Sequence, residues 1–210
     1  MDTDPGIVCF QHCGPKVFCF GLGSSCPACG QPLRPDTHFM LLPFRVPYPF
    51  ARATQHPCSI VIRPTHGDFL NDYFNSKDLH IAVTSSSGVV VEFDRSGLRQ
   101  HLDGDAWRQC IVLNDESDDL EMIKEQWDET LMRISKQPCW SSESYDENNY
   151  NCYTFVLAFL RSLGSGSLSQ AAAGNRTSFC EKFIVPRTTA AGKYVSVYRR
   201  VRNMGYYIQK

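Results

Sequence analysis

The sequence predicts an α+β fold in which an antiparallel sheet packs on one central, buried helix. Three observations predict this class of fold. Strand-like runs gather between residues 58 and 113, helical patterns occupy residues 117–135 and 149–163, and a short cysteine-rich segment precedes them. Strands and helices that occur in separate groups, rather than in regular alternation, are typical of α+β domains.

Composition narrows the class of protein. Of the 210 residues, 42% are hydrophobic and 20% are charged, which is enough apolar material for a core and argues against disorder. The formal net charge of -1 gives no reason to expect a nucleic acid partner. The longest apolar run, residues 155–160, is far shorter than the roughly 20 residues that a membrane span needs.

The ten cysteines are many for a chain of this length. The N-terminal residues are acidic and no apolar run follows them, so we expect no secretory signal and a cytoplasmic or nuclear location. Thiols remain reduced in those compartments, and a framework of disulfide bonds is therefore not expected.

Three parts are expected along the chain. Residues 1–35, dense in cysteine, glycine and proline, are predicted to form a small zinc-ribbon-like appendage. Residues 36–57 are rich in proline and aromatic residues, which predicts an extended connector rather than a helix. Residues 58–210 are predicted to form the α+β domain.

The N-terminal cysteines have the spacing of a zinc site. Cys26 and Cys29 are separated by two residues and followed by a glycine, the arrangement of a zinc knuckle. Cys9 and Cys13 supply a second pair of ligands, with His12 as an alternative ligand. Four such ligands would hold a structural zinc ion, and without a metal so short a segment could hardly fold.

Four short runs predict the sheet, at residues 59–63, 79–84, 89–94 and 110–113. The second and third runs are joined by a Ser/Gly-rich turn and predict a hairpin. Pairing their apolar faces predicts Glu92 directly opposite His80, with Asp94 diagonal to it. A carboxylate in that position would fix the tautomer of the histidine and raise its basicity.

Residues 117–135 show the clearest helical pattern. Apolar residues recur there every three or four positions: Leu120, Ile123, Trp127, Leu131 and Ile134. The acidic residues 115–119 precede this face, and negative charge is favoured at the N-terminal end of a helix dipole.

Residues 149–163 predict a second helix that is apolar on nearly every side and is therefore central. Asn148 or Asn149 would cap it and Gly164 would end it. Cys152 then lies in the first turn, where free N–H groups and the positive end of the helix dipole lower the pKa of a thiol. A nucleophilic cysteine is often found there, although most free cysteines are small buried apolar residues.

The C-terminal part is predicted to be a flexible loop followed by strands. Residues 164–178 are rich in glycine, serine and alanine, which is typical of a flexible loop. Residues 181–185 and 194–201 contain aromatic and β-branched residues and predict two further strands.

A strand histidine that precedes a cysteine at a helix start resembles the circularly permuted papain-like thiol hydrolases. Residues 151–155 resemble the Asn-Cys-x-x-Phe signature of the lecithin:retinol acyltransferase and desumoylating isopeptidase groups. Residues 79–83 resemble the strand that carries their catalytic histidine. The resemblance implies a permuted papain-like core with Cys152 as nucleophile and His80 as base.

The remaining parts of such a site have two candidates each. Glu92 or Asp94 would orient the base. Asn151 or the backbone N–H of Cys152 would stabilise an oxyanion.

A second resemblance covers nearly the whole chain. Residues 64–70, 78–80, 126–128, 151–153 and 185–188 resemble motifs of the makorin-2 opposite-strand protein family. This resemblance implies a family but no activity.

Two functions therefore remain open. The first is a cysteine-dependent hydrolase or acyltransferase that acts on an amide, isopeptide or ester bond of a protein or acyl substrate. The second is a catalytically inactive interaction protein on the same scaffold. The reactivity of Cys152 distinguishes the two, because only a nucleophile needs a thiol that ionises readily.

Overall fold

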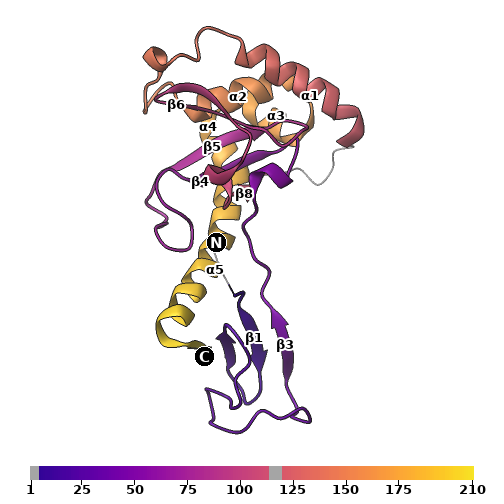
Figure 1. The fold of residues 1–210 in the computed structure, drawn as a ribbon, viewed down its shortest axis with the longest axis vertical. Helices are drawn as coiled ribbons and strands as arrows, with labels where there is room; N and C mark the ends of the chain where they lie inside the picture. The colour runs from indigo at the N-terminus through magenta and orange to yellow at the C-terminus, as the bar shows by residue number, and fades with distance from the viewer. Residues whose placement is uncertain (1–4, 114–119) are drawn as a thin grey trace. The chain divides into compact units, whose positions relative to one another are not determined.

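The structure, a computed structural model, describes residues 5–113 and 120–210 and divides into two compact units (Figure 1). The first unit contains Met1–Pro49 and Ala191–Lys210, and the second contains Phe50–Ala190. The C-terminal residues therefore group with the cysteine-rich N-terminal residues, whereas the sequence assigned them to a domain beginning at residue 58.

A four-stranded antiparallel sheet forms the first unit. Its strands are β1 (Val8–Gln11), β2 (Lys16–Cys19), β3 (Leu41–Arg45) and β9 (Tyr206–Gln209), in the order β3-β1-β2-β9. Phe10, Val17 and Cys19 form a buried cluster with Cys26. Because Cys26 belongs to the predicted zinc knuckle, this small core joins the sheet to the candidate metal ligands.

A five-stranded antiparallel sheet forms the second unit. Its strands are β4 (Ile60–Pro64), β5 (Leu79–Thr84), β6 (Val90–Asp94), β7 (Gly97–His101) and β8 (Ile111–Val112), in the order β7-β6-β5-β4-β8. The four strands predicted from the sequence are confirmed. The sequence does not predict β7, because Arg99 and Gln100 are consecutive polar residues that leave no apolar alternation.

The β5–β6 hairpin has a different register from the predicted one. Val83 lies opposite Val91 instead of Val89. The N–H of Ser85 donates to the carbonyl of Val89 (2.8 Å), which moves the turn one residue further along the chain. The same register continued places Glu92 opposite Ala82 rather than His80. A shift by two residues keeps every side chain on its own face of the sheet, so Glu92 and His80 still share a face.

Two long helices of the second unit confirm the predicted helical patterns. They are α1 (Leu120–Ser135) and α2 (Cys152–Leu163). Trp127, Leu131 and Ile134 form the buried face of α1, while the acidic residues 115–119 lie outside the described residues.

Helix α2 is the central helix of the second unit. It packs against β5, β6, α1 and α3 (Gly166–Ala173). Phe155, Val156 and Phe159 have no exposed surface. The apolar run in this helix is therefore core, and its N-terminal end meets the sheet.

The C-terminal part of the chain is helical, contrary to the prediction. Helices α3 and α4 (Arg176–Phe179) replace the predicted flexible loop, and a π-helical segment (Cys180–Ile184) and α5 (Val185–Met204) replace both predicted strands. The tyrosines and valines of α5 favour strands as single residues. Their burial follows helical spacing, since Ala191, Tyr194, Val195 and Val201 are buried, and this packing overrides the propensity.

Short turns complete the described elements. Three 3₁₀ helices lie at Ala53–Gln55, Asp105–Trp107 and Ser142–Ser144. In the described part of the chain, no helix combines the length and the apolar character that crossing a membrane requires.

Candidate thiol–histidine site and metal centre

Cys152 is the first residue of α2, two positions earlier in the helix than predicted, because the cap is Asn151 and not Asn148 or Asn149. The side-chain Oδ1 of Asn151 accepts the N–H of Tyr153 (3.0 Å). In return, Thr154 Oγ1 accepts the N–H of Asn151 (3.1 Å), which completes a capping box. This cap fixes the thiol at the positive end of the helix dipole.

His80 lies on β5 and meets the start of α2. Both His80 and Cys152 are buried, with 6% and 5% of their surfaces exposed. Both residues line the same cavity, and Cys152 is among the groups that raise the pKa of His80. The structure therefore brings together the two residues that the sequence selected as nucleophile and base.

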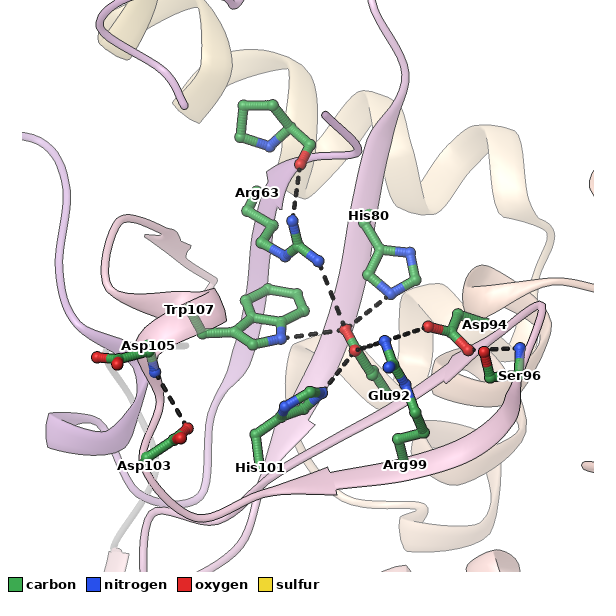
Figure 2. A network of polar contacts seen from close by, with 11 residues as sticks. Arg63, His80, Glu92, Asp94, Ser96, Arg99, His101, Asp103, Asp105 and Trp107 are labelled. Carbon is green, nitrogen blue, oxygen red and sulfur yellow. Dashed lines mark hydrogen bonds and ion pairs between the residues drawn. The ribbon is translucent and has the colours of Figure 1, made fainter. Parts of the chain in front are cut away.

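Glu92, on β6, is the centre of a buried polar network (Figure 2). Its Oε2 accepts hydrogen bonds from His80 Nε2 (3.0 Å) and from the indole Nε1 of Trp107 (3.1 Å). Its Oε1 accepts hydrogen bonds from His101 Nε2 (2.6 Å) and from the Arg99 guanidinium (3.1 Å). Four donors thus surround a carboxylate that has no exposed surface, as a buried charge requires.

The charges of this network shift two pKa values in opposite directions. Burial lowers the pKa of His80, but the hydrogen bonds and negative charges of Cys152 and Glu92 outweigh burial and raise it to about 9. Burial raises the pKa of Glu92, but the hydrogen bonds and positive charges of His80 and His101 outweigh it and lower it to about 2. His80 and Glu92 therefore form a charged pair near neutral pH.

Arg63, on β4, adds a further cation beside this pair. One of its guanidinium nitrogens lies 3.9 Å from Glu92 Oε2, and the guanidinium carbon lies 5.0 Å from the centre of the Trp107 ring. Sequence reasoning did not find Arg63, Arg99, His101 or Trp107. His101 can be assigned to this network only once β7 is known. The pairing of β6 with β7 places Arg99 opposite Glu92 and His101 opposite Val90.

Asp94, the other candidate for the orienting carboxylate, has different partners. Its Oδ1 accepts the N–H of Ser96 (2.7 Å), and its Oδ2 pairs with Arg99. It shares a smaller hollow of about 210 Å³ with His80. The carboxylate in hydrogen-bond contact with His80 is that of Glu92.

Cys152 and His80 open onto a cavity of about 460 Å³. Its walls come from the segment before β5, the segment before α2 and the start of α4. Asn151 also lines it, but its amide is engaged on both sides, since Oδ1 accepts from Tyr153 and Nδ2 donates to the carbonyl of Glu147 (2.6 Å).

The first unit holds a separate cluster of metal-ligating side chains. The ligand atoms of His12, Cys13, Cys26 and Cys29 all lie within 4.8 Å of one another. The sulfurs of Cys13 and Cys26 are 3.8 Å apart, and Cys29 Sγ is 3.4 Å from His12 Nδ1. Ligands of one tetrahedral zinc ion would lie ~3.8 Å apart for two sulfurs and ~3.5 Å apart for sulfur and nitrogen, given the usual bond lengths. The cluster therefore fits a metal of that geometry.

The alternative ligand His12, rather than Cys9, completes this cluster. Cys9 lies on β1 and is buried, with 2% of its surface exposed, and it is not among the clustered residues. Successive side chains of a strand point to opposite faces, which separates Cys9 from the buried face that carries Phe10. Spacing alone could not reveal that orientation.

Comparison with known proteins places the chain in a family of two-part proteins. A family model described as DUF4796 C-terminal matches residues 43–201, and one described as DUF4796 N-terminal matches residues 5–33. The chain belongs to this family. MKRN2 opposite strand protein of Homo sapiens is 31% identical over 207 residues, which cover 99% of this chain and 91% of that protein. This confirms the family that the sequence motifs indicated. No solved structure matches the chain.

Proposed function

We propose that the second unit is a thiol-dependent hydrolase or acyltransferase, with a core like that of the permuted papain-like enzymes. One observation carries the proposal: Cys152, at the start of a buried helix, lines the same cavity as a strand histidine whose Nε2 is held by a buried carboxylate. Nucleophile, base and orienting group are the three parts that such chemistry needs.

The arrangement supports a definite order of proton transfers. Glu92 occupies Nε2 of His80, which leaves Nδ1 for the thiol proton of Cys152. The thiolate attacks a carbonyl carbon, a C–S bond forms, and the C–N or C–O bond breaks as His80 returns the proton to the leaving group. Water then adds to the thioester carbon and gives a proton to His80, the C–S bond breaks, and the carboxylic acid leaves while the thiolate of Cys152 and the protonated His80 are regenerated. An alcohol or amine in place of water gives acyl transfer.

The oxyanion donor best supported is the backbone N–H of Cys152. The capping box engages the N–H groups of Tyr153 and Thr154, and Phe155 N–H donates to the carbonyl of Asn151. Among the hydrogen bonds of the described residues, none uses the N–H of Cys152. Asn151 acts instead as a positioning residue, because its amide holds the helix start.

The test is the pH profile of alkylation of each cysteine by iodoacetamide, read residue by residue by mass spectrometry. We expect Cys152 to react at neutral pH at least tenfold faster than the exposed Cys139, as a nucleophile with an adjacent base does. His80→Gln, which cannot take up a proton, should remove the difference, whereas Arg133→Gln on the exposed side of α1 should not. Equal rates for Cys152 and Cys139 in the native protein would support a non-catalytic interaction protein on this scaffold.

We also propose that the His12, Cys13, Cys26 and Cys29 cluster holds a structural zinc ion. Three thiolates and one imidazole are a common set of four protein ligands for a structural zinc ion. The distances between these side chains fit one tetrahedral ion. The purified protein should contain one zinc ion per chain. Cys13→Ser and Cys26→Ser should lose it, whereas Cys9→Ser should retain it. Loss of zinc in Cys9→Ser alone would restore Cys9 as a ligand in place of His12.

A further inference from the structure

The lining of the cavity beside Cys152 narrows the class of substrate. Only one aliphatic side chain, that of Leu79, belongs to the lining, and the remaining lining residues are charged, polar or aromatic. A long acyl chain gains affinity by leaving water for apolar surroundings, and pockets that hold such ligands are mostly apolar. In this cavity the polar surface exceeds the apolar surface. Its chemistry suits a polar occupant.

Two cations of the lining, Lys77 and Arg176, form no ion pair among the described residues, while one acid of the lining is paired. Glu147 forms an ion pair with Arg95. In the described part of the chain, no ion pair includes Arg176 or Lys77. Both cations line the cavity and are exposed to solvent. A ligand can therefore reach them without breaking an existing ion pair.

Arg176 is held beside the nucleophile. Its guanidinium carbon lies 4.3 Å from the centre of the Tyr153 ring, and Tyr153 is the next residue after Cys152. Stacking on an aromatic face limits the motion of a guanidinium and leaves its N–H groups pointing outward in its own plane. Those N–H groups match the two oxygens of a carboxylate.

Asp78 supplies the complementary group. It also lines the cavity, next to Lys77 in the chain, and can accept an N–H. A peptide offers both features at once, since it carries N–H groups along its backbone and carboxylates on its acidic side chains. A fatty acyl ester offers neither.

We propose that the substrate is a peptide-like amide, peptide or isopeptide, with an acidic side chain that Arg176 binds beside the scissile bond. This inference rests on the proposed thiol chemistry and names its substrate class. Arg176 is then a specificity-determining residue, and Cys152 cleaves the amide C–N bond by the steps given above. The mostly polar lining disfavours fatty acyl esters.

The experiment uses chloroacetyl compounds, in which the thiolate of Cys152 displaces chloride and forms one S–C bond. Four probes are compared on the full-length protein: chloroacetyl-Gly-Glu amide, the isosteric chloroacetyl-Gly-Gln amide, N-dodecyl chloroacetamide and N-methyl chloroacetamide. Rates at Cys152 are measured by mass spectrometry and divided by the rate with the N-methyl compound. This division separates recognition from the intrinsic reactivity of the thiol.

We expect the Glu probe to react about tenfold faster than the Gln probe, the effect of one charge-assisted interaction. Arg176→Gln should bring this ratio close to one. Arg133→Gln, a matched loss of a cation outside the cavity, should leave the ratio unchanged. The dodecyl probe should be no faster than the N-methyl compound.

Two outcomes overturn the inference. Equal rates for the Glu and Gln probes would show that Arg176 selects nothing, and a dodecyl probe faster than both would assign a lipid substrate. Failure of the proposed function is a different result, seen with the N-methyl compound alone, when Cys152 reacts no faster than Cys139. The ratio of the Glu and Gln rates can still be measured in that case, at a pH where the thiol ionises.

Discussion

Glu92 shows how a single buried carboxylate can organise a candidate site. A charge without exposed surface is tolerated only if hydrogen bonds replace its water, and here two imidazoles, an indole and a guanidinium do so. The sequence predicts the His80–Glu92 contact because the alternation of the strands puts both on one face. It cannot predict the other donors, since they come from loops and from a strand without apolar alternation.

The first prediction concerns the pH dependence of stability. The folded-state pKa of Glu92 is lowered to about 2, so its stabilisation is complete above the ordinary carboxyl pKa and is lost as pH falls from there to about 2. The folded-state pKa of His80 is raised to about 9, so its stabilisation is complete below the ordinary histidine pKa and is lost as pH rises to about 9. Stabilisation by the pair is therefore greatest near pH 5–6, between the ordinary values of ~4.3 and ~6.5.

Glu92→Gln should remove both the loss of stability at low pH and the loss of stability at high pH that this pair causes. We expect the variant to lose on the order of 2 kcal/mol of unfolding free energy near pH 6, with a smaller loss at pH 3 and at pH 10. Urea unfolding from pH 3 to pH 10 measures the difference between the two proteins. A difference that does not vary with pH would mean that the ion pair does not form.

The second prediction concerns the indole of Trp107. Trp107 is fully buried, and its Nε1–H donates to Glu92 Oε2. Trp107→Phe removes this donor, shrinks the ring and leaves the carboxylate with one donor fewer. We expect a loss of about 2 kcal/mol of unfolding free energy. We also expect a higher apparent pKa of His80, because the ionised carboxylate is no longer partly neutralised by the indole N–H; NMR titration of the ring measures this pKa. Trp140→Phe is the matched control, because its indole donates to the carbonyl of Ile134 and not to Glu92. The same His80 titration in both variants would contradict the prediction.

At the scale of elements, the contrast between α2 and α5 shows what a sequence pattern can predict. Helix α2 has an Asn cap, a terminal glycine at φ +73° and an apolar run, and its existence and end are confirmed. Helix α5 contains Tyr194, Val195 and Val201, whose β propensity hides the helical spacing of its buried face. Local signals predict the element that positions Cys152, and tertiary packing determines the C-terminal helix.

The third prediction concerns the cap of α2. Asn151→Ala removes the acceptor of the Tyr153 N–H and the amide that donates to Glu147, so we expect a loss of about 1 kcal/mol of unfolding free energy. Because the first turn then frays, Cys152 should also be alkylated several-fold more slowly at neutral pH.

A second cap provides the control for this variant. Asn175 caps α4 by accepting the N–H of Ser178 (2.9 Å), and this cap does not hold the first turn of α2. Asn175→Ala should leave the alkylation rate of Cys152 unchanged. Equal slowing in both variants would show a general loss of stability rather than an effect of the α2 cap.

At the scale of the whole molecule, residues from the two ends of the chain belong to the same structural unit. The sequence predicts boundaries at residues 35 and 57 from changes in composition. Composition reports only on residues that are close together in the chain. The unit that contains the cysteine cluster is completed by Ala191–Lys210, whose strand β9 pairs with β2 along its length. Such pairing depends on contacts between the two ends of the chain, and no local signal indicates it.

The fourth prediction follows from this grouping. The first unit has a small core, Phe10, Val17, Cys19 and Cys26, and Cys26 is also a candidate metal ligand. Removal of zinc with a chelator should therefore unfold this unit, including β9, since small cores with a structural metal depend on it. The second unit has a large core of its own around α2 and should remain folded.

Limited trypsin digestion of the full chain, with and without chelator, measures this difference. Cleavage after Lys16 and Arg45, and after the basic residues from Lys193 to Arg202, should become rapid once zinc is removed. Sites within Phe50–Ala190 should remain protected, and alkylation of Cys152 should keep its rate. Restored zinc should restore protection, because metal binding and folding of the small unit are one equilibrium. Uniform cleavage along the chain after chelation would instead mean that the zinc site stabilises the whole protein, and unchanged cleavage would mean that the sheet of the first unit folds without a metal.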